Sequence, residues 1–304
     1  MNQSDEMLLL RASAGGEINT VRSLVSRGRC NVNTQIHPYK ATPIFMAAFC
    51  DHLEVVQYLF ENGADINLVS SNGGYPLLCA AQEGYLKVVR FLCENGSEIN
   101  KNDNNLETPV TLAIANGHFE VLLCLAEHGA DCKSPRLISG SSLISFAARM
   151  GHMNIVRYLF EEHEADLTYA VGTGTPLISA SSGGHLEIVT YLASVGADLN
   201  VRHNEGGCSF SAIEYASFYG HNKIVRFLRD KGVFFRCANC LILGEGVDES
   251  TNLLKCAGCR WVRYCSKECQ KVHWAFHKEG CKAAQRAKKE KTYLELSKMN
   301  LGPM

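Results

Sequence analysis

Apolar and polar positions recur along most of the chain with a period of about 33 residues. The period is marked by an alanine inside a short apolar segment, and neighbouring alanines are 33 to 36 residues apart: Ala12, Ala47, Ala80, Ala113, Ala147, Ala180 and Ala216. A fixed period of 20–50 residues is typical of repeat proteins, in which each copy is one supersecondary unit. The pattern therefore predicts about seven stacked copies of one unit.

Each unit is predicted to hold two short helices. In the second copy, Pro43 suits a first helical turn because the amide it lacks would be unpaired there. Small and branched apolar residues then follow at helical spacing, at Ile44, Ala47, Ala48, Val55, Val56, Leu59 and Phe60. Spacing of this kind indicates helices with one apolar face. The small Ala47 is expected to let the second helix approach closely.

Turn residues separate and end the predicted helices. Four residues after each alanine stands a turn residue: Gly16, Asp51, Gly84, Gly117, Gly151, Gly184 and Gly220. Twelve residues later a second glycine ends the second helix in every copy except one, where His163 stands instead. Histidine follows the first turn in five copies, and each is expected to serve its own turn rather than share a metal ion. The scattered cysteines before Gly232 are expected to be small buried side chains.

These motifs resemble the ankyrin repeat. The matching segments are Thr42-Pro43-Ile44, Thr108-Pro109-Val110 and Thr175-Pro176-Leu177, together with Gly63-Ala64-Asp65, Gly129-Ala130-Asp131 and Gly196-Ala197-Asp198. The resemblance covers residues 4–233 and implies an all-α ankyrin-repeat solenoid of about seven helix-turn-helix repeats that binds a protein. The fifth repeat has an extra residue near Glu164, and the last has Ser211-Ala212 in place of Thr-Pro.

Two groups of positions are candidates for that protein-binding surface. They are the loop tips Tyr39, Lys40, Asn72, Asn104 and His203, and the inner helix ends Phe49, Gln82, Glu83, Asn116, Arg149, Met150, Phe218 and Tyr219. The alternative for any one of them is plain solvated surface or a contact between repeats.

Charge divides the chain after Gly232. Residues 1–232 hold 17 Lys and Arg against 24 Asp and Glu, whereas the rest holds 13 against 7. The whole chain has a net charge of −1, so we expect no direct nucleic-acid partner. No apolar run approaches the roughly 20 residues that span a bilayer, so no membrane insertion is expected. The acidic start with only a four-residue apolar stretch does not favour a signal peptide, which predicts an intracellular protein, cytoplasmic or nuclear.

Metal-ligating residues are concentrated after residue 236. Four close pairs follow one another: Cys237 and Cys240, Cys256 and Cys259, Cys265 and Cys269, His277 and Cys281. Thiolates and an imidazole in such pairs are the donors of tetrahedral Zn²⁺ sites, so eight donors predict two zinc ions. A disulfide framework is the alternative, but nothing in the sequence indicates an oxidising compartment.

The segment 237–281 resembles a MYND-type zinc finger, carried by the run from Arg263 to Cys281. The resemblance implies that the first and third pairs hold one ion and the second and fourth the other, with His277 rather than His273 as the ligand. It also implies that the finger captures a proline-rich peptide, with Gln270 and Trp274 as the matching residues; Trp274 as a mere core residue is the alternative. The predicted domains are 4–233 for the repeats, 234–281 for the finger and 282–304 for a basic, helical tail.

Together these features predict a non-catalytic adaptor that joins one protein partner on the repeats to a proline-rich peptide on the finger. Neither a nucleotide-binding loop nor a catalytic triad is present in the sequence, so no small-molecule substrate is expected. Two alternatives stay open. The first alternative is a transcriptional corepressor that is recruited to chromatin through partners, and the second is a component of a ubiquitin ligase.

Overall fold

The computed structural model describes residues 3–28, 30–133, 140–170, 172, 174–205, 208–233, 254–255 and 263–264. The chain forms two compact units, Met1–Ala165 (unit 1) and Asp166–Met304 (unit 2), and each is described by itself.

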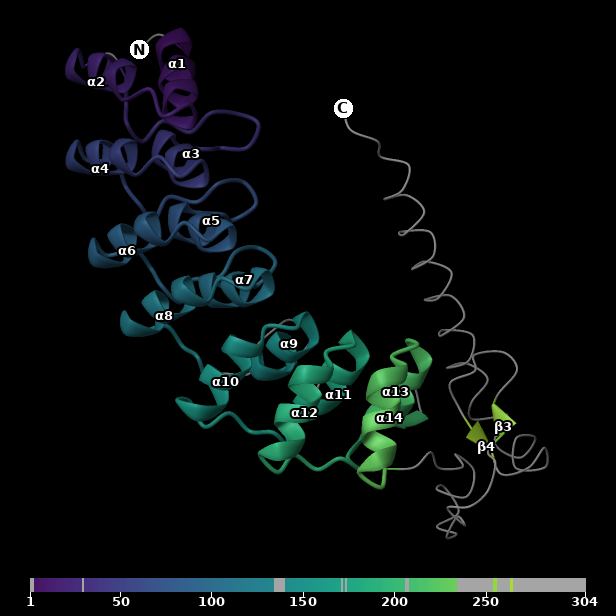
Figure 1. The fold of residues 1–304 in the computed structure, drawn as a ribbon. Coiled ribbons are helices and arrows are strands. Elements are labelled where there is room, and N and C mark those ends of the chain that lie inside the picture. The colour runs from purple at the N-terminus through teal and green to yellow at the C-terminus, as the bar shows by residue number, and fades with distance from the viewer. Residues whose placement is uncertain are drawn as a thin grey trace. The chain divides into compact units, whose positions relative to one another are not determined.

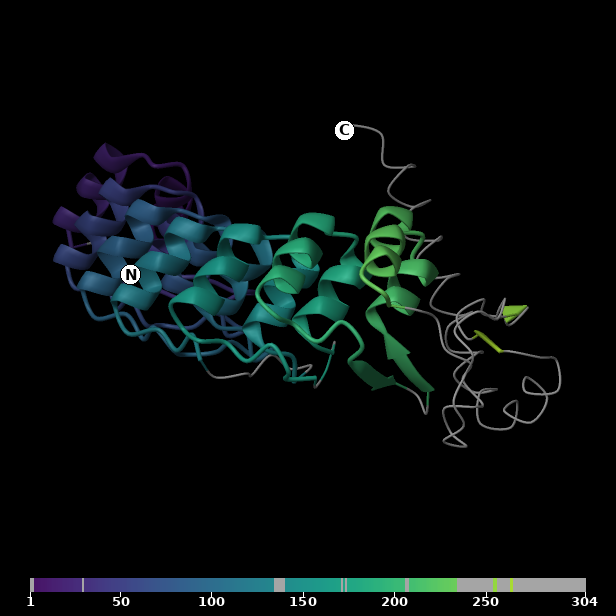
Figure 2. The same ribbon diagram turned by 60° about the horizontal axis from the view of Figure 1, so that its bottom comes forward.

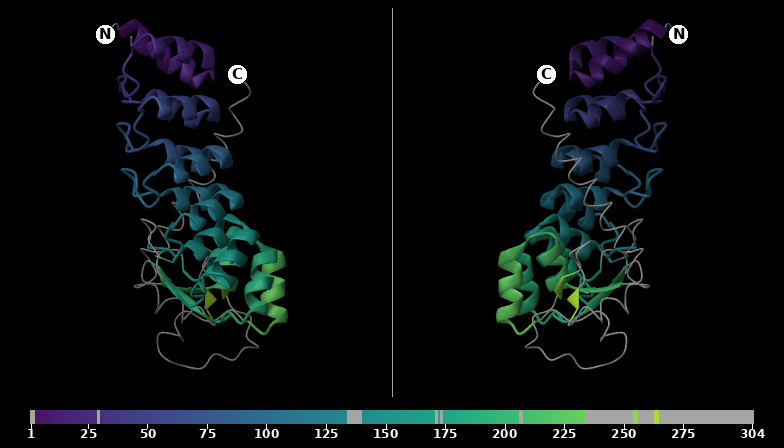
Figure 3. Two further views of the ribbon diagram at one scale, coloured as in Figure 1. Left: turned by 90° about the vertical axis from the view of Figure 1, so that its left-hand side faces the viewer. Right: turned by 90° about the vertical axis from the view of Figure 1, so that its right-hand side faces the viewer.

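Unit 1 consists of five helix pairs stacked in chain order (Figure 1). The pairs are α1 (Gln3–Ala14) with α2 (Ile18–Ser26), α3 (Pro43–Phe49) with α4 (Leu53–Glu61), α5 (Pro76–Glu83) with α6 (Leu86–Glu94), α7 (Pro109–Asn116) with α8 (Phe119–Glu127), and α9 (Leu143–Met150) with α10 (Met153–Glu161). The first helices of successive pairs pack on one another from α1 to α9, and the second helices from α2 to α8 form the next layer. The long loops between pairs leave unit 1 on one side (Figure 3).

Side-chain caps explain where the first helix of a pair begins. The Thr42 hydroxyl accepts a hydrogen bond from the Phe45 amide at 3.2 Å. Thr108 caps α7 in the same way and exchanges a second bond with Thr111. Ser142 replaces threonine before α9 and accepts from the Ser145 amide. These bonds satisfy amides that a helix start leaves unpaired, which is the reason for the threonine-proline pattern.

The alanines that mark the repeat period lie in the core of unit 1. Ala47, Ala80, Ala113 and Ala147 are completely buried, and so are Val56, Val89, Leu122 and Val156 of the second helices. An alanine here lets the two helices of a pair approach closely enough to exclude water. The prediction of a repeated two-helix unit with an alanine at its centre is therefore confirmed for unit 1.

Unit 2 continues the same pattern and adds strands. Its helices are α11 (Pro176–Gly183), α12 (Leu186–Ser194), α13 (Ala212–Phe218) and α14 (Asn222–Asp230). Strands β1 (Arg202–Glu205) and β2 (Cys208–Ser211) form an antiparallel hairpin that leads into α13 (Figure 2). This hairpin was not predicted, although Gly206-Gly207 between two short runs of residues is a sequence signal for a hairpin. A second antiparallel pair joins β3 (Leu254–Lys255) to β4 (Arg263–Tyr264).

Candidate functional site

The predicted metal-binding segment is represented in the structure by β3 and β4. Leu254 pairs with Tyr264 and Lys255 with Arg263. Cys256 is the next residue after β3, and Cys265 is the next residue after β4. All eight predicted zinc ligands lie outside the described residues, as do Gln270, Trp274 and the tail 282–304.

The donor set itself provides the test of which metal fits. Seven cysteines and one histidine give soft sulfur donors and an imidazole, the combination that structural zinc sites use. Carboxylate ligands, which calcium and magnesium require, are not part of the paired pattern. The residues present therefore fit zinc, which supplies folding free energy to a small segment rather than chemistry.

Turn histidines of the described repeats bind a backbone carbonyl of a neighbouring repeat. In the described part of the chain, no group of three or more His, Cys, Asp or Glu side chains is arranged to hold an ion. Four turn histidines instead reach a backbone carbonyl of the preceding repeat, with Nε2 to oxygen distances of 3.0 to 3.3 Å: His52 to Ala14, His118 to Gln82, His152 to Ala115 and His221 to Ser182. The expectation that each histidine serves only its own turn is thus incomplete, because the ring links two repeats.

The glycine at the turn is needed for this link. At Gly84 a Cβ atom would lie 2.5 Å from Nδ1 of His118, which is too close for any side chain. Gly84 also adopts a φ of 83°, a conformation that favours glycine. The turn glycine of one repeat and the turn histidine of the next repeat therefore depend on each other.

Four of the six cysteines in unit 1 are buried, as expected: Cys79, Cys93, Cys124 and Cys132. Cys30 and Cys50 are only half-buried, so the expectation was wrong for these two, and none of the six forms a disulfide. Burial raises the pKa of Cys93 to about 12 and that of Cys132 to about 11. Both are therefore protonated near neutral pH, which makes them poor nucleophiles and poor metal ligands.

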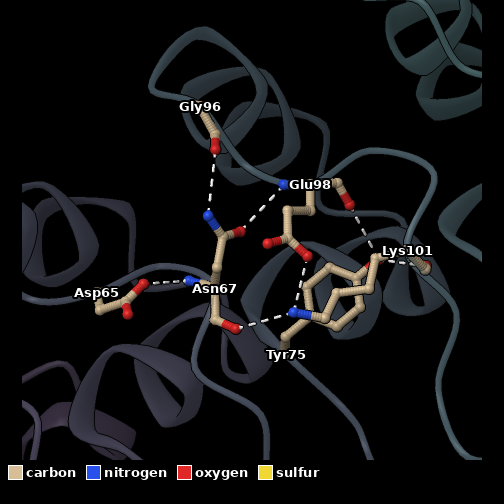
Figure 4. Close-up of polar contacts among 6 residues, drawn as sticks. All are labelled: Asp65, Asn67, Tyr75, Gly96, Glu98 and Lys101. Carbon is tan, nitrogen blue, oxygen red and sulfur yellow. Dashed lines mark hydrogen bonds and ion pairs between the residues drawn. The ribbon is translucent and has the colours of Figure 1, made fainter.

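Neighbouring loops are joined at their base by a repeated asparagine bridge. The Asn67 side chain donates to the Gly96 carbonyl at 3.2 Å and accepts from the Glu98 amide at 3.0 Å (Figure 4). Asn33 and Asn100 make the same two bonds one repeat before and one repeat after. The bridge fixes the spacing of successive loops.

Tyr75 and Lys101 strengthen this base at one position. Tyr75 replaces the capping threonine of its repeat, is completely buried, and donates its hydroxyl to the Lys101 carbonyl at 2.7 Å. The Lys101 ammonium lies 2.8 Å from a Glu98 carboxylate oxygen and 3.3 Å from the Asn67 carbonyl (Figure 4). Sequence analysis did not find this cluster, because its members are spread over 34 residues.

Most of the predicted surface positions are exposed. Tyr39 is 73 % exposed, Phe49 42 % and Met150 44 %, while Gln82, Glu83, Asn116 and Arg149 also face solvent. His203 is different. Only 9 % of it is exposed, and its Nδ1 lies 3.1 Å from the Ala170 carbonyl. Its prediction as an exposed loop tip was wrong, because it belongs to β1 and packs over Gly174.

Comparison with family models decides the classification of the repeats. The family described as ankyrin repeats (3 copies) matches residues 1–70, 62–136 and 144–239, well over half of the chain. The chain belongs to the ankyrin-repeat family. The MYND finger family matches residues 237–281, the segment of the paired cysteines, and a MYND zinc finger implies zinc binding. Ankyrin repeats and MYND fingers are protein-interaction modules, not catalytic ones.

Individual relatives of this ankyrin-repeat chain match only in part. It is 40 % identical over 101 residues to "Probable E3 ubiquitin-protein ligase XBOS33" of Oryza sativa subsp. japonica, covering 33 % of this chain and 18 % of that protein. It is 45 % identical over 47 residues to "Histone-lysine N-methyltransferase ASHR1" of Arabidopsis thaliana, covering 16 % of this chain and 10 % of that protein. Human "Ankyrin repeat domain-containing protein 49" is 37 % identical over 70 residues, covering 23 % of this chain and 29 % of that protein. The chain thus spans less than a third of the length of each.

Within the ranges that the structure describes, no helix is long and apolar enough to cross a bilayer.

Proposed function

We propose that the protein is a non-catalytic adaptor that brings two proteins together. The observation that carries this proposal is the presence of two different interaction modules, ankyrin repeats and a MYND finger, in one chain. The repeat surface takes one protein partner, and the finger takes a proline-rich peptide of another. We place the boundaries at 4–233 for the repeats and 234–281 for the finger, with the tail at 282–304.

We further propose how the finger is built. Two zinc ions are held, one by Cys237, Cys240, Cys265 and Cys269, and one by Cys256, Cys259, His277 and Cys281. Two separate tetrahedral sites whose ligand pairs alternate along the chain tie the whole segment together. Trp274 then offers a flat aromatic face for proline, and Gln270 offers an amide to the peptide backbone.

Peptide binding by the full chain tests the proposal. Purified protein in zinc-containing buffer is titrated into fluorescent proline-rich peptides from an array. We expect Trp274→Ala to abolish binding and Trp274→Phe, which keeps an aromatic face, to retain most of it. Zinc content measured on both variants shows whether the finger is still loaded. Absence of binding to any proline-containing peptide contradicts the proposal for the finger.

Zinc stoichiometry is tested separately on the wild-type chain. We expect two tightly held zinc ions per chain, measured by elemental analysis after dialysis against metal-free buffer. Replacing Cys237 by Ser removes one ligand from the first site alone and is expected to lower the content to about one ion. A stoichiometry of one in the wild type contradicts the two-site arrangement.

A role in a ubiquitin ligase is the second candidate, and one observation favours it: the partial similarity to the rice protein named a probable E3 ubiquitin-protein ligase. The matched part covers only 18 % of that protein. An auto-ubiquitination assay with the purified chain separates the two candidates, because an adaptor gives no ubiquitin conjugates without another ligase subunit.

A further inference from the structure

The loops between helix pairs in unit 1 form an ordered edge. Each of three successive loops, residues 36–41, 70–74 and 103–107, is closed at its base by a backbone hydrogen bond of 2.8 to 3.2 Å. Together these three loops are called the loop edge here. All three leave unit 1 on the same side (Figure 3).

Hydrogen bonds also join the tips of the loop edge. The Ser71 amide and hydroxyl both donate to the Tyr39 carbonyl, at 2.8 and 3.1 Å. Asn104 reaches back to the same middle loop, where its side chain donates to the Ser71 carbonyl at 3.2 Å. Because both base and tip are bonded to the next loop, the edge is ordered before any partner binds, which lowers the entropy cost of binding.

In four consecutive repeats, one loop position has a left-handed backbone. It lies seven residues before the buried alanine, and its φ is 51° at Lys40, 82° at Gly73, 62° at Leu106 and, in the loop that follows the loop edge, 71° at Gly140. Glycine suits this conformation, whereas a side chain makes it unfavourable. Two of the four positions nevertheless carry large side chains, and local strain kept in this way is typical of functional positions.

The side chains at these strained positions face solvent. Leu106 is 54 % exposed, Lys40 is exposed, and Tyr39 beside it is 73 % exposed. Within the described residues, Lys40 has neither a hydrogen bond nor an ion pair. In the part of the chain that the structure describes, no polar contact of the Lys40 side chain offsets the free energy that its conformation costs, and more than half of Leu106 is left in contact with water.

Charge at the loop edge indicates the chemistry of a partner. The Asp103 carboxylate already accepts hydrogen bonds from the amides of Asn105 and Glu107, at 2.8 and 2.9 Å. The Glu107 carboxylate accepts from the Thr111 hydroxyl at 2.6 Å. The acidic groups of the third loop are thus engaged, whereas the Lys40 ammonium is available for a carboxylate.

We infer that the loop edge binds an extended peptide segment with one acidic and two large apolar residues. The acidic residue pairs with Lys40, one apolar residue lies on the Tyr39 ring, and the other lies against Leu106. Packed helices are about 10 Å apart, so two repeats separate these anchors by about 20 Å. An extended chain rises about 3.3 Å per residue, which puts the two apolar residues about six positions apart.

The net negative charge of the repeats opposes an acidic peptide at long range. At physiological ionic strength this opposition is screened beyond about 8 Å, whereas contact with Lys40 is not. The inference rests on the proposed function, since it names the partner of the repeat surface.

Degenerate peptides provide the probe. A fluorescent ten-residue library, Ser-Glu-Phe followed by five positions of mixed Ser, Thr and Asn and then Leu-Ser, is titrated with the full chain, together with the library in reverse order. A matched library has Lys in place of Glu. We expect the wild-type chain to bind the Glu library about fivefold more tightly. Lys40→Glu is expected to reverse that preference, and the control Lys87→Glu on α6 to leave it unchanged.

Leu106→Gly separates binding from folding. The substitution relieves the left-handed strain, so the melting temperature should rise by about 2 °C. It also removes an apolar anchor, so binding of the Glu library should weaken about tenfold. If Leu106 had only a structural role, its replacement would not make the protein more stable and weaken peptide binding at the same time. Equal binding by wild type and Leu106→Gly, an unchanged preference in Lys40→Glu, or no binding of either library overturns the inference.

Failure of this inference is distinguishable from failure of the proposed function. The proline-rich peptide assay is run on the same protein preparations. If the proline-rich peptide binds and the Glu library does not, only the loop-edge inference is overturned. If neither binds, the adaptor proposal fails with it.

Discussion

The loops of unit 1 and the hairpin of unit 2 occupy corresponding places in the repeat but are held by different contacts. The loop 70–74, for example, is fixed by hydrogen bonds to the loops on both sides. Its Ser71 amide donates to the Tyr39 carbonyl, and its Ser71 carbonyl accepts from the Asn104 side chain. The β1–β2 hairpin is fixed by its own strand pairing and by Arg202, whose guanidinium lies 3.0 Å from the Glu214 carboxylate. Order in the first case comes from bonds with the loops on both sides. Order in the second comes mostly from contacts within the hairpin and with α13, and the contact of His203 with the Ala170 carbonyl is its link to the preceding loop. The two should therefore respond differently to mutation.

Removing the hairpin's anchor is expected to have the largest effect. The Glu214 carboxylate is 4 % exposed, and besides Arg202 it accepts hydrogen bonds from the amide and hydroxyl of Ser211. Glu214→Ala removes the buried carboxylate that pairs with the largely buried Arg202 guanidinium, which costs about 3 kcal/mol. Thermal unfolding followed by circular dichroism should show a transition roughly 6–12 °C lower.

The control for this prediction is Glu187→Ala, which removes an exposed carboxylate from α12. It should change the free energy of unfolding by less than about 0.5 kcal/mol. Equal destabilisation by both variants would show that the hairpin does not depend on Glu214.

Weakening a bond between repeats should have an intermediate effect. Tyr75→Phe keeps the buried ring but removes the hydroxyl that donates to the carbonyls of Lys101 and Glu98, at 2.7 and 3.3 Å. Two carbonyls then lose a partner in a partly buried place, which costs about 1.5 kcal/mol. Urea denaturation measures the change.

Tyr39→Phe is the matched control, because its ring is 73 % exposed and no contact of its hydroxyl is seen in the described residues. It should leave stability unchanged. Since the Tyr75 bonds join two repeats, Tyr75→Phe is also expected to lower the steepness of the urea transition. A uniform, fully cooperative shift would count against shared order.

A substitution within one turn should have the smallest effect and the opposite sign. Asp51 replaces the turn glycine of the second repeat and has a φ of 60°. Asp51→Gly relieves that strain at the cost of a more flexible unfolded chain, so the net gain is about 0.5 kcal/mol. Gln57→Gly, in the middle of α4, should instead lose about 1 kcal/mol. A loss of stability in Asp51→Gly would mean that the aspartate makes up for its backbone conformation.

Local features of the repeats could be predicted from the sequence, because they depend on neighbouring residues. Pro43 does begin α3, Thr42 does cap it, and Ala47 is buried where the period placed it. The contacts of Tyr75 with Lys101 and of His52 with Ala14 could not be predicted, because they depend on the stacking geometry of different repeats. The prediction for His203 failed for a related reason. The residue lies in strand β1 of a hairpin that was not predicted, and not at an exposed loop tip.

The candidate site divides in the same way. Spacing predicted paired cysteine and histidine ligands, since metal chemistry limits which residues can act together. The choice of His277 over His273 came from the resemblance to the MYND finger, and all eight ligands stay predictions. Which pairs share an ion, and whether Trp274 meets a peptide, depend on three-dimensional arrangement and stay predictions. The strain at Lys40 and Leu106 could not be predicted from the sequence either, because neither residue type indicates a left-handed backbone conformation.

The asparagine bridges have a consequence for how such a chain changes length. Asn33, Asn67 and Asn100 each supply one donor and one acceptor to the following repeat, and the Gly63, Gly96 and Gly129 carbonyls accept in turn. A tandem duplication of residues 67–99 would carry Asn67 together with the Gly96 carbonyl and the Glu98 amide that it binds, so the new copy would bring a complete bridge with it. Growth and shortening by whole modules are thereby compatible with an intact stack, whereas a gain of a few residues is tolerated only in a loop.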